Sequence, residues 1–141
     1  MQEHKISPKE YRNILDSVLL ENIALNRLNT KVERGYLTNN LVIDIKESNT
    51  FTQNNNVLTI LFNYRMVAKA EDAEKAGFTL TSVYEVTYNI IDGVVITKDF
   101  MKIFSDLTLG VLLWPYFREL INSTVLKMGL PALVLPMRRV Y

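Results

Sequence analysis

The chain has 141 residues, of which 48% are hydrophobic and 22% charged, with a formal net charge of +1 and no cysteine. This composition predicts one folded domain over residues 1–141, and it excludes a disordered chain, disulfides and cysteine metal sites. Because the lysines and arginines are scattered, we expect no nucleic-acid partner. No apolar run approaches the roughly 20 residues of a membrane span, and no secretory signal opens the chain, so we expect a cytoplasmic protein without membrane insertion.

The first predicted element is a short helix near the N-terminus. Its start carries residues that commonly cap and begin helices, namely Ser7, Pro8 and Glu10. The following segment, residues 19–32, has a composition that permits either a continued helix or a strand. Its own residues leave that choice open.

Three further segments alternate between apolar and polar residues, which is typical of antiparallel strands with one buried face. They are residues 41–46, 58–70 and 78–91. We predict a polar, Asn-rich loop over residues 49–56, broken only by Phe51. The acidic connection at residues 71–77 is interpreted as a solvated turn rather than a cation site.

The C-terminal part predicts a short helix, a long helix and an apolar tail. Thr97 can cap the short helix, which runs through Ser105. The long helix is expected to begin at Asp106 or Thr108, with a kink or break at Pro115. Its buried stripe follows three-and-four spacing and comprises Leu113, Phe117, Leu120, Ile121, Val125 and Met128. Gly129 supplies the left-handed position that ends many helices.

The residues offer little support for catalysis. His4 is the only histidine, and no arrangement of serine, lysine and carboxylate surrounds a candidate general base. A glycine-rich phosphate loop is also missing from the sequence. We therefore predict a protein that is not an enzyme and uses neither a cofactor nor a metal.

The segment from Trp114 to Pro136 contains two linked motifs, formed by Pro115, Tyr116, Arg118 and Glu119 and by Gly129, Pro131, Leu133, Leu135 and Pro136. They resemble the C-terminal helix and tail of the SecB family of export chaperones. In that family the helix opens with Pro-Tyr-x-Arg-Glu and ends in Gly-x-Pro-x-Leu-x-Leu-x-Pro. The resemblance implies an α+β fold, with a four-stranded antiparallel sheet packed on one face by a short and a long C-terminal helix. It assigns residues 19–32 to the first strand, with one face formed by Leu19, Ile23 and Leu25.

The resemblance also implies a function. Members of the family hold unfolded polypeptides without ATP, as homotetramers built from two dimers. The implied partner is an unfolded client, either a preprotein for the Sec translocase motor or one dedicated protein such as an antitoxin. The family's groove is lined by the loop after the second strand and by the long helix. The corresponding candidates for client binding are Phe51, Phe100, Phe104, Leu112, Trp114, Tyr116 and Phe117.

Core packing is the stronger explanation for Phe117, so Phe51, Trp114 and Tyr116 are the better candidates for client binding. Polar residues of the long helix are expected at subunit contacts instead: Arg118, Glu119 and Asn122. Two other functional classes stay open. In an oligomeric scaffold, Phe51 and Trp114 would be buried between subunits, and in a small-ligand domain the aromatic residues would close a compact pocket.

The sequence departs from the export members of the family in three respects. Its charge is near neutral, whereas export members are strongly acidic. The sequence ends directly after the tail motif and lacks cysteine, so we expect no zinc-binding tail. Among four residues expected on the outer face of the sheet, Thr79, Thr81, Glu85 and Thr87, only Glu85 is acidic. These differences weaken an export role more than a chaperone role.

Overall fold

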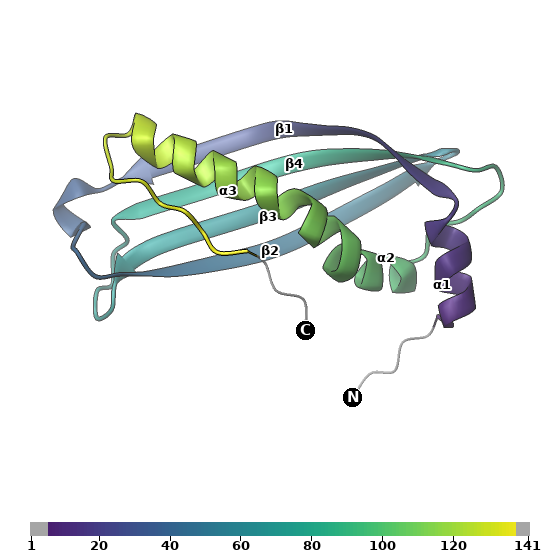
Figure 1. Ribbon diagram of the computed structural model, residues 1–141, viewed down its shortest axis with the longest axis horizontal. Helices are drawn as coiled ribbons and strands as arrows, with labels where there is room; N and C mark the ends of the chain where they lie inside the picture. The colour runs from purple at the N-terminus through teal and green to yellow at the C-terminus, as the bar shows by residue number, and fades with distance from the viewer. Residues whose placement is uncertain (1–5, 138–141) are drawn as a thin grey trace. The chain divides into compact units, whose positions relative to one another are not determined.

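The computed structural model describes residues 6–137, and His4 lies outside them. By their internal contacts these residues fall into two units. The sheet unit comprises residues 16–94, and the helical unit comprises residues 6–15 and 95–137. Four antiparallel strands and a C-terminal helical segment confirm the predicted α+β class (Figure 1).

The sheet unit is one four-stranded sheet with the spatial order β1-β4-β3-β2, all pairs antiparallel. Its strands are β1 (Val18–Val32), β2 (Leu41–Asn54), β3 (Val57–Ala70) and β4 (Phe78–Ile90). A 3-10 turn, η1 (Arg34–Tyr36), separates β1 from β2. Strands β3 and β4 occupy the centre, and β1 and β2 are the two edges (Figure 1).

The two central strands carry the core of the sheet. Every second side chain is buried along β3 and β4, as their alternation predicted. We call this side of the sheet the apolar face, and its buried members are Leu58, Ile60, Phe62, Tyr64, Met66, Ala68, Phe78, Leu80, Ser82, Tyr84, Val86, Tyr88 and Ile90. The opposite side, with Thr79, Thr81, Glu85 and Thr87, is the polar face.

Strand β1 confirms the strand assignment for residues 19–32 but corrects its face. Its register with β4 shifts twice, leaving Glu21 and Asn26 as bulged residues. Leu20 pairs with the buried Tyr88, whereas Leu19 pairs with Asn89 on the polar face. Directly opposed residues share a face, so Leu20, not Leu19, joins Ile23 and Leu25. The prediction for Leu19 was wrong because a bulge reverses the alternation.

The predicted Asn-rich loop is largely strand. Strand β2 continues to Asn54 and pairs with β3 without interruption, so only Asn55 and Asn56 turn the chain. Asn55 has a positive φ of 55°, a conformation that asparagine tolerates better than most residues. Phe51 therefore lies in β2 opposite Ile60, on the apolar face, and not in a loop. The long paired hairpin outweighed the weak strand propensity of the asparagines.

The helical unit begins with α1 (Pro8–Leu15), where the Glu10 amide donates to Ser7 Oγ over 3.2 Å, as the capping pattern predicted. The C-terminal helices are α2 (Lys98–Phe104) and α3 (Gly110–Lys127). Thr97 caps α2, again as predicted, by accepting from the Phe100 amide.

The predicted new start at Asp106 or Thr108 was wrong. A π-helical turn, η2 (Ser105–Leu109), joins α2 to α3, and its flanking residues keep right-handed helical angles without a side-chain cap. Helix α3 also continues through Pro115 without a break. It ends as expected: Gly129 has φ 75°, and the Leu130 amide donates to the Val125 carbonyl over 2.9 Å.

Candidate functional site

The C-terminal tail, residues 130–137, is held to α3 by two side chains. Trp114 Nε1 donates to the Pro136 carbonyl over 2.8 Å, and Arg118 Nε donates to the Leu135 carbonyl over 2.7 Å. The two donors are four residues apart, so they lie one above the other on the same side of the helix. Two neighbouring carbonyls of a non-helical, apolar segment are thus bound by one helix face.

This arrangement recognises backbone rather than sequence. Every residue of a polypeptide offers a carbonyl acceptor, and an indole or guanidinium N–H donates to it whatever the attached side chain. The tail contributes apolar side chains that differ in exposure: Leu135 is buried, whereas Val134 and Met137 are exposed. Trp114 and Arg118 were both singled out from the sequence, but their shared action on one segment became visible only in the structure.

Four predicted aromatic residues of the helical unit form two ring pairs. Phe100 stacks on Phe104 with ring centroids 5.1 Å apart, and Phe100 also contacts Tyr11. Trp114 contacts Phe117 with centroids 5.7 Å apart. Phe100, Phe104 and Phe117 are all buried. Their exposure in a client groove stays a prediction.

The remaining candidates differ in exposure and direction. Leu112 and Trp114 are half-buried, and Tyr116 is 47% exposed. Residues two apart in a helix point about 200° from each other, so Trp114 and Tyr116 lie on different sides of α3. Leu112 shares the side of Tyr116. Phe51, in the sheet unit, is half-buried on the apolar face.

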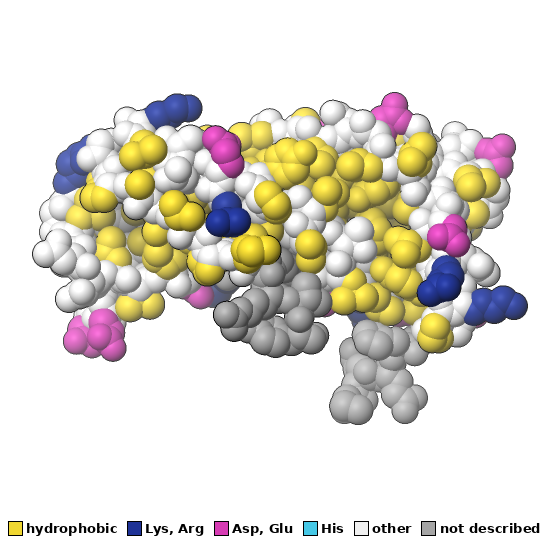
Figure 2. All heavy atoms as spheres, viewed as in Figure 1, with side chains coloured by type: hydrophobic (Ala, Val, Ile, Leu, Met, Phe, Trp, Pro, Cys, Tyr) yellow, Lys and Arg dark blue, Asp and Glu magenta, His cyan; other side chains and the backbone are white. Residues whose placement is uncertain are grey.

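Further exposed apolar side chains occur on η2 and α3 (Figure 2). Leu107, Val111 and Leu126 are all exposed, and sequence reasoning did not select them. The sequence could have indicated their exposure, because they lie outside the three-and-four stripe of buried residues. An apolar residue outside that stripe does not face the core. With Tyr116, they make α3 apolar on more than its buried side.

The polar residues expected at subunit contacts have distinct surroundings. Arg118 is half-buried and bound to the tail, and Glu119 is exposed. Asn122 has a buried Oδ1 that accepts no hydrogen bond from the described residues. A buried acceptor without a hydrogen bond is destabilising. The interface role of these three residues stays a prediction.

Titration and metal chemistry do not single out a reactive centre. Burial raises the pKa of Tyr88 to about 12, and burial also raises the pKa of Tyr11. Within residues 6–137, no group of three or more histidine, aspartate or glutamate side chains could hold a metal ion. No helix in the same range is long and apolar enough to cross a membrane.

Comparison with known proteins adds a structural likeness. No family model and no curated protein matches the sequence. Among solved structures, the Mycobacterium tuberculosis SecB-like chaperone Rv1957, in complex with a ChAD peptide from the HigA1 antitoxin Rv1956, matches with a TM-score of 0.75. The match covers 90% of this chain and 95% of that one at 15% identity. The chain has a SecB-like fold.

The SecB-like fold confirms the architecture inferred from the C-terminal motif. A protein of unknown function from Streptococcus agalactiae matches less well, with a TM-score of 0.44 and 12% identity over 85% of this chain and 97% of that one. That second likeness is too weak to support a structural inference. At 15% identity, the first likeness establishes the fold and leaves function to be argued from the residues.

Proposed function

We propose that this chain is a cytoplasmic, ATP-independent holdase that binds unfolded polypeptides in an extended form without catalysing a reaction. The carrying observation is that Trp114 and Arg118 bind two neighbouring backbone carbonyls of a non-helical apolar segment. A holdase must accept many sequences, and backbone recognition meets that requirement. In the proposed complex, a client segment replaces the tail on these two donors.

Apolar contacts would supply the remaining affinity. The proposed contacts on the helical unit are the exposed side chains of Leu107, Val111 and Tyr116 and the partly exposed Leu112. Phe51 is a separate proposed contact on the sheet unit. Each buried Å² of apolar surface contributes about 25 cal/mol before entropic costs, so many weak contacts along a client add up. The antitoxin peptide bound by the structural neighbour supports a peptide client for this fold.

The proposed assembly is a homotetramer of two dimers. One observation supports self-association of this chain. Edge strand β1 exposes Leu20, Leu25 and Leu28 on one face, and an edge strand with exposed apolar side chains readily pairs with another chain.

The test is suppression of aggregation of a chemically unfolded, aggregation-prone protein, followed by light scattering without nucleotide. Native mass spectrometry on the same sample gives the assembly. Suppression near stoichiometric ratio by a tetramer is expected. The Trp114→Phe and Arg118→Met double variant, which removes both donors, should suppress several-fold less well. A Lys127→Gln variant, with a change at an exposed position of the same helix, serves as the control.

A tetramer that leaves the aggregation of that aggregation-prone protein, of an unfolded preprotein and of an unfolded antitoxin all unchanged would refute the holdase and favour the oligomeric scaffold. Equal loss of activity in the control would refute the role of the two donors. The two client classes separate by adding either an unfolded preprotein or an unfolded antitoxin to the same assay. Suppression restricted to the antitoxin would identify a dedicated chaperone and exclude general export.

A further inference from the structure

The polar face of the sheet is basic, although the chain as a whole is nearly neutral. The strand register places five basic residues on this face, Arg27, Lys31, Lys46, Arg65 and Lys69, and two acidic residues, Asp44 and Glu85. The bulged Glu21 adds a third carboxylate, which accepts from Asn89 Nδ2. These cations come from three strands and lie far apart in the sequence. Pairing of the strands brings them onto one surface.

Three of the cations surround a shallow hollow of about 470 Å³ that crosses all four strands. Arg27 lines it from β1, Lys46 from β2 and Arg65 from β3, and one acidic residue, Glu47 of β2, also lines it. Side chains between them can donate or accept hydrogen bonds, including Asn63, whose Nδ2 donates to Ser48 Oγ over 3.3 Å. All three cations are exposed, and none forms an ion pair within residues 6–137.

The strand register places two like charges close together on this face, and they repel each other. Lys46 stands directly opposite Arg65 in the β2–β3 pair. Like charges opposite each other on a sheet destabilise it, because the two side chains are only about 5 Å apart at their Cβ atoms. An anion placed between them would convert that repulsion into two attractions. The pair therefore indicates a site for a negatively charged group.

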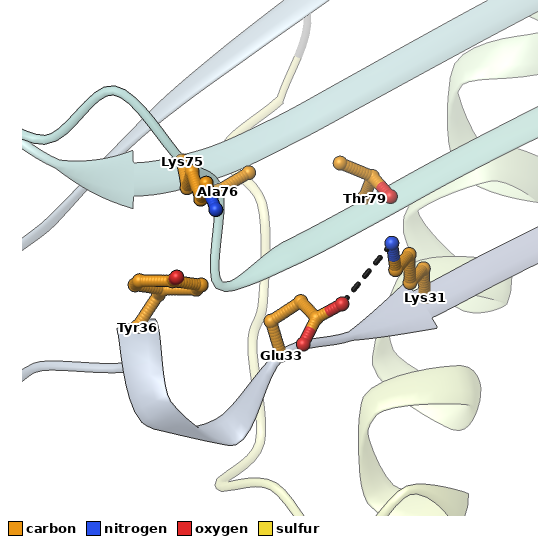
Figure 3. Close-up of a pocket in the computed structure, with 6 residues that line it drawn as sticks. All are labelled: Lys31, Glu33, Tyr36, Lys75, Ala76 and Thr79. Carbon is orange, nitrogen blue, oxygen red and sulfur yellow. Dashed lines mark ion pairs between the residues drawn. The ribbon is translucent and has the colours of Figure 1, made fainter.

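In a neighbouring hollow on the same face, a lysine is paired with a carboxylate of the same chain. Lys31 Nζ contacts the Glu33 carboxylate at 3.0 Å, and Lys75 Nζ lies 5.6 Å from the ring centre of Tyr36. These residues, with Thr79, line a hollow of about 370 Å³ (Figure 3). Lys31 and Thr79 are paired on the polar face. At this end of the sheet, the charge of Lys31 is thus balanced by a carboxylate of the same chain.

We propose that the polar face binds an acidic segment of another polypeptide, with carboxylates placed on Arg27, Lys46 and Arg65. Arginine binds carboxylates through two parallel hydrogen bonds, and lysine adds a point charge. Nucleic acid fits this face less well. The hollow's polar-face side chains include no aromatic ring on which a base could stack, and Asp44 and Glu85 would repel a continuous phosphate backbone.

The experiment is fluorescence anisotropy of a labelled peptide that alternates glutamate and serine, titrated with the full chain. A peptide with glutamine for glutamate and a single-stranded oligothymidine serve as comparison ligands. The glutamate peptide should bind, with an affinity that falls as salt rises. The Lys46→Gln and Arg65→Gln double variant should weaken binding about tenfold. Lys98→Gln, which removes a cation of α2, should leave binding unchanged.

A Lys46→Glu variant gives an independent readout. It removes the repulsion with Arg65, so its melting temperature should rise while binding of the glutamate peptide is lost. Absence of binding to the glutamate peptide, or equal binding of the glutamine peptide, would refute the proposal. If oligothymidine binds more tightly than the glutamate peptide, and the same variants lose that binding, the surface is a nucleic-acid site instead. The assay does not require holdase activity, so the two proposals can fail separately.

Discussion

The central and edge strands of the sheet carry similar apolar residues, but these residues differ in burial. Strands β3 and β4 bury alternate side chains, whereas no residue of β1 or β2 is buried. Yet β1 carries leucines at several positions of its apolar face, much as β3 and β4 carry their core residues. The difference is location, since an edge strand has a neighbour on one side only.

The comparison shows that apolar content does not distinguish a core strand from an interface strand. In β3 and β4 the apolar side chains stabilise the fold of one chain. In β1 they stay exposed, and we propose that a second chain covers them. The difference can be tested by comparing variants from each class of strand.

The largest expected effect comes from the central strands. Phe62 on β3 is 1% exposed, and Phe62→Ala should lower the free energy of unfolding by about 3–5 kcal/mol through lost burial and a cavity. Phe51→Ala on the edge strand β2 should lower it clearly less, because Phe51 is already half-exposed. Urea unfolding of both variants measures the contrast, and equal losses would contradict it.

The next effect concerns assembly. Leu25 on β1 is 43% exposed, and Leu25→Asp should weaken the proposed subunit contact about tenfold or more while leaving the monomer folded. Ile43→Asp, at an exposed position on the apolar face of β2, is the matched control. Native mass spectrometry over a dilution series should show dissociation only for the β1 variant. Unchanged assembly of Leu25→Asp would rule out β1 as the contact.

A smaller effect should appear at high pH. Tyr88 on β4 is buried, and burial raises its pKa to about 12 from an ordinary value of 10.0. Between these values the unfolded chain has lost this proton and the folded chain keeps it, so stability falls as pH rises from about 10 to about 12. Tyr88→Phe should make that fall shallower in urea unfolding. An identical slope in the variant would show that Tyr88 does not contribute.

The smallest effect lies at the turn that joins edge strand β2 to central strand β3. Asn55→Ala should cost about 1 kcal/mol, because alanine disfavours the positive φ observed there. Asn55→Gly should preserve stability, and Asn54→Ala, within the strand, should change it less than Asn55→Ala. Thermal unfolding of the three variants tests the order. A larger loss for Asn54→Ala than for Asn55→Ala would mean that the turn conformation is not limiting.

The sequence predicted local structure best where a single residue pattern ran without interruption. Strict alternation identified the faces of β3 and β4, and capping residues located α1 and α2. It failed where two signals combined. Bulges at Glu21 and Asn26 mixed spacings of two and three in β1, which also made a helix plausible. The asparagines before Asn55 indicated a loop, whereas cross-strand pairing kept them in β2.

The candidate sites were predictable to different degrees. Trp114 and Arg118 were identifiable from the C-terminal motif, but their common acceptors could be found only once the tail's path was known. The phase of alternation could have placed Lys46 and Arg65 on the polar face. Their direct opposition depends on the β2–β3 register, and the face of Arg27 depends on the bulge beside it.

The two bulges of β1 should also disfavour fibre formation. A long, flat edge with exposed leucines would accept strand after strand in open-ended growth. Strand β1 spends 15 residues opposite 13 of β4, and each extra residue bends the edge and increases its twist. A bent edge fits a partner with matching curvature, such as a second copy related by twofold symmetry, better than a straight strand of another protein. The exposed leucines that promote pairing therefore lie on an edge strand whose shape favours a closed assembly over open-ended growth.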